Sequence, residues 1–109
     1  PPRLPPVRSE ALVRSIYQLQ TEIYGLQVAL TGRPLLPRLM FRIDQLPPMG
    51  EDLVALSQGR PRLKVLAEEV NLELYRLRQS AHLRNRAAMY DSLTTLQDLL
   101  ARMRIQPPS

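Results

Sequence analysis

The chain has 109 residues, a net charge of +5 and no cysteine. This length predicts a single domain that can bury a core without metals or disulfides. The lack of cysteine excludes a disulfide framework and a thiolate metal site, and it favours an intracellular location, cytoplasmic or nuclear. The sequence shows no charged-then-apolar leader pattern and no apolar run of about 18 residues, so we expect neither a signal peptide nor a membrane partner.

The first eight residues contain four prolines, in the order Pro-Pro-Arg-Leu-Pro-Pro-Val-Arg. Proline removes backbone donors and favours extended structure, which predicts a linker over residues 1–8. The alternative is a ligand for an aromatic groove. A start at Pro1-Pro2 rather than Met is expected of an excised segment or a processed product. We expect one helical domain over residues 9–106 and a short tail over residues 107–109.

A first helix is predicted over residues 10–31. Ser9 can cap its start, and the segment from Thr31 to Pro34 contains the Gly-x-Pro signal that ends it. Its large apolar residues are spaced alternately four and three apart, as in a coiled-coil seam. They are Leu12, Ile16, Leu19, Ile23, Leu26 and Leu30. Because the flanking positions lack complementary charges, we interpret the seam as packing within a bundle, with a two-stranded coiled coil as the alternative.

Two short connecting helices are expected next. Pro37 suits the first turn of an amphipathic helix over Arg38–Leu46, and the segment from Pro47 to Gly50 is expected to end it. Acidic residues favour the positive end of a second short helix over Glu51–Leu56, which the segment from Gly59 to Pro61 closes.

The remaining sequence predicts one very long C-terminal helix over about residues 62–105, because no proline or glycine occurs in it. Apolar or small residues recur about every 3.64 residues, which is the period of a straight helix. At about 1.5 Å per residue, this helix would span roughly 65 Å, more than any other predicted helix of the chain could cover. The alternative is a break near residues 79–85 that folds the segment into a hairpin, although no glycine or proline marks such a break.

An uncovered apolar stripe predicts self-association. A second chain against the open side of the long helix would give a homodimeric bundle. The residues expected to mediate this self-association are Leu93, Leu96, Leu100 and Met103.

Residues that could support catalysis or bind a cofactor are scarce. His82 is the only histidine, and no carboxylate lies within one turn of it along the helix. Glu68, Glu69 and Glu73 lack the Glu-x-x-His motif of di-iron bundles and are interpreted as a solvated face. No phosphate-binding loop or nucleophile elbow is present. We therefore predict no enzymatic activity, no cofactor, no metal and no small-molecule substrate.

Basic residues cluster in the middle of the predicted long helix, and all but one of the chain's basic residues are arginine. The candidate contact residues are Arg76, Arg78, Arg84 and Arg86. Arginine binds phosphate well, which would suit nucleic acid, but at 100° per residue these four side chains would encircle a helix. An acidic protein partner is therefore favoured over nucleic acid as their ligand.

Together these features predict an all-α, elongated helical bundle. The predicted function is a non-enzymatic interaction or oligomerisation module, a scaffold or adaptor within a larger protein or assembly. The alternative is a nucleic-acid-binding helical domain that uses the arginine cluster on phosphates.

Overall fold

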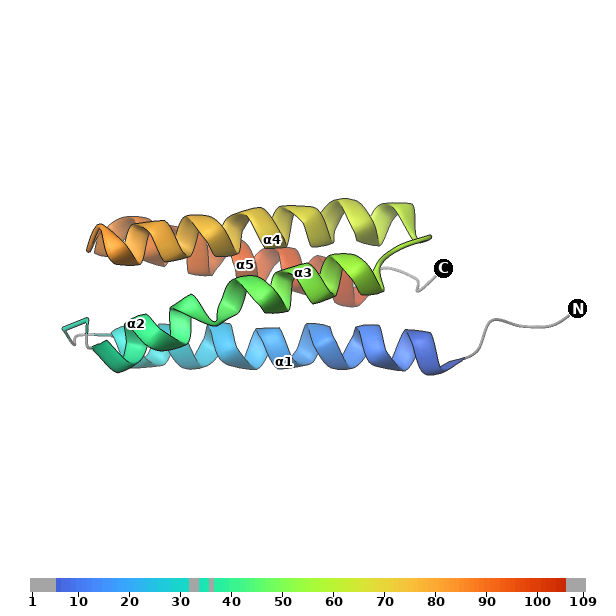
Figure 1. The fold of residues 1–109 in the computed structure, drawn as a ribbon, viewed down its shortest axis with the longest axis horizontal. Helices are drawn as coiled ribbons and strands as arrows, with labels where there is room; N and C mark the ends of the chain where they lie inside the picture. The colour runs from blue at the N-terminus through green and yellow to red at the C-terminus, as the bar shows by residue number, and fades with distance from the viewer. Residues whose placement is uncertain (1–5, 32–33, 36, 106–109) are drawn as a thin grey trace, which may run out of the picture.

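The computed structural model describes residues 6–31, 34–35 and 37–105. Five helices follow one another in this part of the chain: α1 (Pro6–Leu30), α2 (Pro37–Asp44), α3 (Leu46–Leu56), α4 (Pro61–His82) and α5 (Arg86–Ile105). They form an elongated bundle about 20 Å across (Figure 1). The predicted fold class, an elongated all-α bundle, is confirmed.

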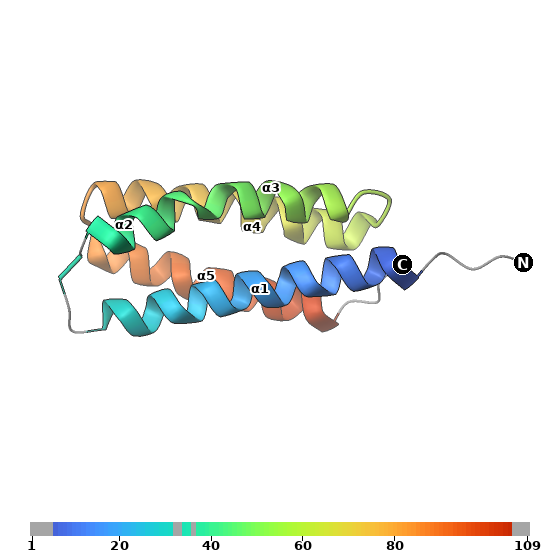
Figure 2. The same cartoon turned by 60° about the horizontal axis from the view of Figure 1, so that its bottom comes forward.

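The five helices make four antiparallel rods, because α2 and α3 follow each other along one edge (Figure 2). Helix α1 packs against α3 and α5, and α4 packs against the same two helices on the other side. This is the up-down-up-down arrangement of a four-helix bundle, in which each rod presents one apolar side to the centre.

Helix α1 presents its alternately spaced apolar residues to the centre of the bundle. Each of the six seam residues from Leu12 to Leu30 is at most 3% exposed. The interpretation of this seam as packing within the bundle is therefore confirmed. The helix begins at Pro6, so Ser9 lies inside it, and the predicted extended linker is wrong for residues 6–8. The rest of that linker, residues 1–5, and the predicted tail lie outside the described residues.

The two short helices meet at Gln45, and their predicted boundary is wrong. Helix α3 begins at Leu46, so Pro47 and Pro48 open a helix instead of ending one. The first turn of a helix tolerates proline because its backbone N–H groups have no partner within the helix. Gly50 also continues α3, at a point where its backbone lies close to Asn71 of α4.

The predicted continuous helix over residues 62–105 is wrong, and the alternative break within residues 79–85 is correct. Helix α4 ends at His82 and α5 begins at Arg86. The turn has the hydrogen bonds of a Schellman motif, from Asn85 N to Ser80 O (2.9 Å) and from Arg84 N to Ala81 O (3.0 Å). Arg84 occupies the left-handed position of this motif, with a φ of 55°, where glycine is usual.

Asn85 then starts the next helix. Its side-chain Oδ1 accepts a hydrogen bond from Ala88 N at 3.1 Å, and its carbonyl oxygen accepts one from Met89 N at 3.0 Å. This is the geometry of an N-cap, for which asparagine is among the preferred residues. The hairpin lets α4 and α5 bury their apolar stripes against each other within one chain, and this packing explains why the segment is not straight.

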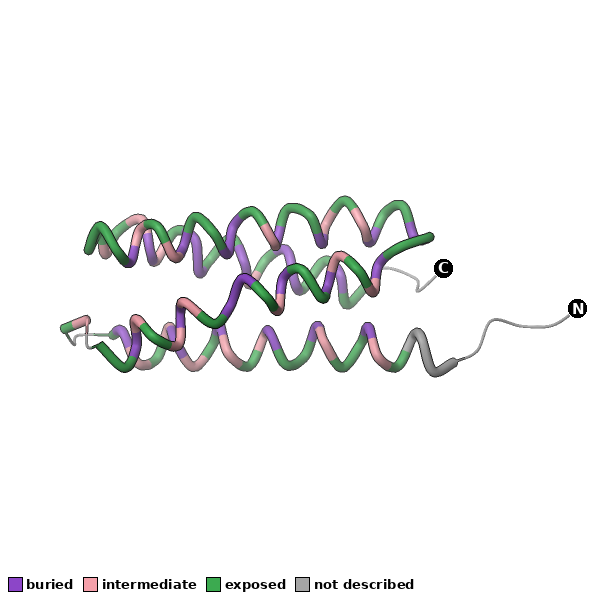
Figure 3. Tube along the Cα trace, in the orientation of Figure 1, coloured by how far each residue is buried: buried purple, intermediate pink, exposed green. Residues whose placement is uncertain are grey.

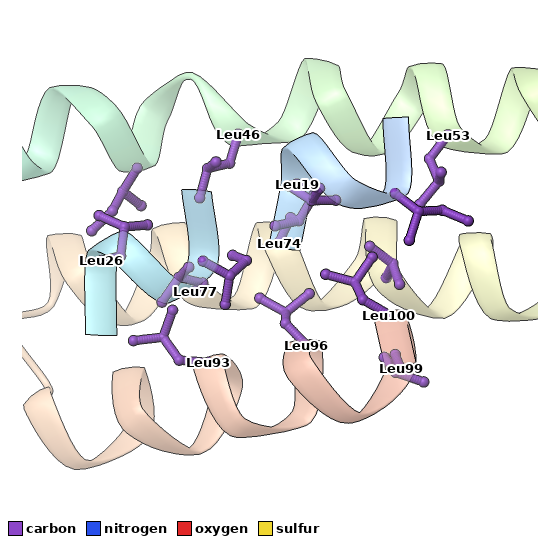
Figure 4. Packing of buried hydrophobic residues seen from close by; sticks show 14 of the residues in the cluster. Leu19, Leu26, Leu46, Leu53, Leu74, Leu77, Leu93, Leu96, Leu99 and Leu100 are labelled. Carbon is purple, nitrogen blue, oxygen red and sulfur yellow. The ribbon is translucent and has the colours of Figure 1, made fainter. Parts of the chain in front are cut away.

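The core runs along the whole axis of the bundle and draws on all five helices (Figure 3). In its middle, Leu19 and Leu26 of α1 approach Leu74 and Leu77 of α4 and Leu96 of α5 (Figure 4). One polar contact accompanies this packing between α4 and α5, where Ser92 Oγ donates a hydrogen bond to Glu73 Oε2 at 2.7 Å. Both residues are less than a tenth exposed, so the contact satisfies two buried polar groups at once.

Candidate protein-binding surface

The residues predicted to mediate self-association lie in the interior of a single chain. Leu93, Leu96 and Leu100 are completely buried, and Met103 is 2% exposed. Helix α5 turns these side chains towards α1 and α4, which already cover them. The assignment of the self-association surface to these four residues is therefore wrong, because the hairpin supplies the cover that a second chain was expected to supply.

The two candidate arginines on α4 contact neighbours on the same helix. Arg76 Nη1 lies 3.2 Å from Glu73 Oε1, and the guanidinium of Arg78 lies over the ring of Tyr75, 4.9 Å from its centroid. Arg76 therefore shares the carboxylate that also accepts from Ser92. These side chains balance a buried acid and cover an aromatic ring.

The other two candidate arginines flank the turn between α4 and α5. Arg86 Nη1 donates a hydrogen bond to Leu30 O at 2.6 Å, and the Tyr90 hydroxyl donates to the same oxygen at 2.9 Å. A cation at this point stabilises the C-terminal end of α1, where backbone carbonyls lack helical partners. Arg84 and Arg86 also line a cavity of about 220 Å³. The four arginines thus do not act as one cluster.

His82 has a carboxylate partner that is distant in sequence. Its Nε2 lies 2.8 Å from Asp44 Oδ1, where the last residues of α2 and α4 meet. Both side chains are more than a third exposed, so this pair ties two helix ends together at the surface. Within the described residues, no group of three or more acidic, histidine or cysteine side chains is placed to hold a metal ion.

One face of α1 combines exposed apolar side chains with little charge along most of its length. Val13, Tyr17, Tyr24 and Val28 of α1 are 46%, 47%, 65% and 57% exposed, and we call these four residues the α1 outer face. At 100° per residue they fall within about 60° of one another, on the side of α1 away from its core seam. Between Ser15 and Thr31 the only charged residue is Glu22, which pairs with Arg42 of α2 at 3.5 Å.

The border between the α1 outer face and α5 is defined by two contacts. Gln97 Nε2 donates a hydrogen bond to Gln27 Oε1 at 3.1 Å, and the guanidinium of Arg104 lies over the Tyr17 ring, 4.6 Å from its centroid. The glutamine pair keeps the C-terminal half of this border neutral. Arg104 places a positive charge at the other half, beside Tyr17.

The outer side of α4 provides a contrast. It also exposes apolar side chains, Val65 and Leu72, but charged residues surround them. These include Arg62, Glu68, Glu69 and Arg76, all exposed. Single apolar side chains among charges are ordinary on protein surfaces, whereas large apolar patches are what binding surfaces expose.

Tyr75 on this side of α4 is expected to titrate above its ordinary pKa of 10.0. Its hydroxyl donates a hydrogen bond to Glu51 Oε1 at 2.9 Å, and this bond together with the charge of Glu51 raises the pKa of Tyr75. The contribution to stability is therefore present below pH 10 and is lost as the pH rises through the raised pKa. Glu51→Gln should lower the Tyr75 pKa, as followed by the NMR shift of its ring carbon, while Asp52→Asn should leave it in place. Identical titration curves for Glu51→Gln and the unaltered protein would contradict the assignment.

Sequence reasoning did not identify the α1 outer face. The spacing of Val13, Tyr17, Tyr24 and Val28, together with the scarcity of charge around them, was the signal that could have found it. The buried seam of the same helix has a closely similar spacing, so the sequence offers two apolar rows and no means of deciding which one the bundle covers. No helix in the described part of the chain is long and apolar enough to span a membrane.

Comparison with known protein families, curated proteins and solved structures found no match to this chain.

Proposed function

We propose that this protein is a non-enzymatic helical interaction module that binds another protein surface through the α1 outer face. The observation that carries the proposal is the row of half-exposed valines and tyrosines along a helix whose other side already fills the bundle core. Tyrosine is enriched at protein interfaces because its ring buries a large apolar area while its hydroxyl keeps a hydrogen-bond partner.

The core supports this proposal, because it is complete without these residues. The apolar side chains that point inwards are buried by the chain itself. Apolar side chains that remain outside on one neutral face do not contribute to that core, and burying them against a partner would be favourable by about 25 cal/mol per Å².

Phosphate binding by the predicted arginine cluster receives less support. Arg76, Arg78 and Arg86 each contact a group within the chain, and Arg86 is engaged with the end of α1. A nucleic-acid site needs cations that converge on one backbone path. The net charge of +5 alone predicts only a general, salt-sensitive attraction to polyanions.

Site-specific photo-crosslinking in the cells that make the protein tests the proposal. Benzoylphenylalanine in place of Tyr24 should yield a discrete covalent adduct on irradiation, because this side chain would lie against the partner. The matched control carries the same amino acid in place of Leu72, which is 52% exposed on α4, and should yield none. Circular dichroism should show equal helix content for both variants.

The position of the adducts decides the outcome. An adduct at residue 24 and none at residue 72 supports the α1 outer face as the binding surface. Equal adducts at both positions, or none at either, would contradict the proposal.

A further inference from the structure

The four residues of the α1 outer face are symmetric about one point of the helix. Val13 and Val28 are equally far from the midpoint between Gln20 and Thr21, and so are Tyr17 and Tyr24. When two identical helices pair in opposite directions about that point, each valine meets a valine and each tyrosine meets a tyrosine. Self-complementarity of this kind is what a twofold symmetric interface requires, since residue i contacts j while j contacts i.

We propose that the partner of the α1 outer face is the same face of a second copy of this chain, antiparallel to the first, with the twofold axis passing between Gln20 and Thr21. This inference rests on the proposed function and names its partner. In the resulting pair, Tyr17 of each copy stacks near Tyr24 of the other, and Val13 packs on Val28 of the other. At the axis, Gln20 and Thr21 each lie next to the same residue of the other chain, where their polar side chains can form hydrogen bonds with each other.

Charge favours the antiparallel direction. Arg14 follows Val13, and Arg104 lies over Tyr17, so both cations sit at the N-terminal half of the face, where the exposed Glu10 lies one turn before Arg14. A parallel pair would place each of these arginines next to the same arginine of the second chain. The antiparallel pair separates the two Arg104 side chains by roughly 10 Å along the helix axis and the two Arg14 side chains by roughly 20 Å. Those distances reach or exceed the screening length of about 10 Å at 0.1 M salt, so the repulsion is small.

The size of the surface also fits a second copy. One long side of the bundle is about 37 Å long, the length of the 25-residue α1, and about 20 Å wide. A stable interface takes about 800 Å² from each partner, so the contact would use most of this side, including the exposed residues of α5 next to the α1 outer face. Between Ser15 and Thr31 the only charge on α1 is Glu22, which pairs with Arg42, so the centre of a contact between two copies buries no unpaired ion.

Cysteine crosslinking tests the direction and the axis together, because the chain contains no cysteine of its own. A disulfide needs Cα atoms about 4.4–6.8 Å apart. Thr21→Cys lies beside the proposed axis and should form a disulfide-linked dimer by itself under mild oxidation. Val13→Cys alone and Val28→Cys alone should stay monomeric on a non-reducing gel, while a mixture of the two should link. Leu72→Cys on α4 is the matched exposed control and should not link.

A second measurement uses the protein without cysteines. Sedimentation across a series from micromolar to near-millimolar concentration should show a monomer–dimer equilibrium. Tyr24→Ser combined with Val28→Ser should shift this equilibrium to monomer with little change in thermal midpoint, and Val65→Ser combined with Leu72→Ser should leave it unchanged.

Three results would overturn the inference. Linking of Val13→Cys with itself would show a parallel pair, and linking of Leu72→Cys as efficiently as Thr21→Cys would show random collision. A monomer at every concentration would show that the partner is not a second copy. If the residue 24 photo-adduct then contains a different protein, the proposed function stands and only the identity of the partner fails.

Discussion

Leu96→Asp is expected to unfold the protein. Leu96 is completely buried in the middle of α5, where it faces α1 and α4 (Figure 4). Truncation of such a leucine to alanine costs about 2–5 kcal/mol, and a carboxylate at the same place adds the cost of burying a charge without a partner. Because a domain of this size has about 5–15 kcal/mol of stability in all, we expect the cooperative melt seen by circular dichroism to be lost or shifted far down in temperature.

The neighbouring substitution Thr95→Asp provides the control. Thr95 is exposed on the same turn of α5, so Thr95→Asp should change stability by no more than about 0.5 kcal/mol. A folded, monomeric Leu96→Asp variant would contradict the structure, because it would mean that this leucine lies in an interface between chains and not in the core of one.

Gly50→Ala and Gly25→Ala are expected to change stability in opposite directions. A Cβ atom on Gly50 would lie 2.6 Å from Asn71 Oδ1, 2.8 Å from Leu74 Cδ1 and 3.1 Å from the Asn71 Cα atom. The last of these contacts is with backbone, so α3 would have to move away from α4. Overpacking of this kind costs about 1–3 kcal/mol, which should outweigh the gain of up to about 1 kcal/mol from the higher helix propensity of alanine.

Gly25 in α1 lacks this constraint. A Cβ atom there would meet only Arg42 Nη2, at 3.2 Å, and that flexible side chain can shift. Gly25→Ala should therefore stabilise the protein by up to about 1 kcal/mol, and Gly50→Ala should lower the thermal midpoint by roughly 5–10 °C. Calorimetry or urea unfolding measures both. Equal effects of the two substitutions would contradict the close approach of α3 and α4. No backbone from another helix approaches Gly25 closely, so glycine is tolerated at this position and not required.

The candidate site residues were harder to predict from the sequence than the fold was, because their positions depend on tertiary structure. The four candidate arginines and the four candidate self-association residues were chosen from their positions along one continuous helix predicted from the sequence. Once Arg84 and Asn85 turn the chain, that helix becomes two antiparallel helices, and positions that were neighbours in a helical projection are no longer neighbours in space. The contact between His82 and Asp44 also depends on tertiary structure, because these residues belong to different helices.

By itself, the sequence determined the helical class, the start of α4 at the Pro61 turn and the core positions of α1. Each of these depends on local geometry, because the helical repeat places Leu12, Ile16 and Leu19 on one side whatever lies opposite. The turn at Arg84 was decided only by tertiary structure. A non-glycine residue at a left-handed position costs roughly 1 kcal/mol locally, so local signals disfavour a break there. Burial of Leu93, Leu96 and Leu100 against α1 and α4 offsets that cost, and this gain exists only when all four rods are assembled.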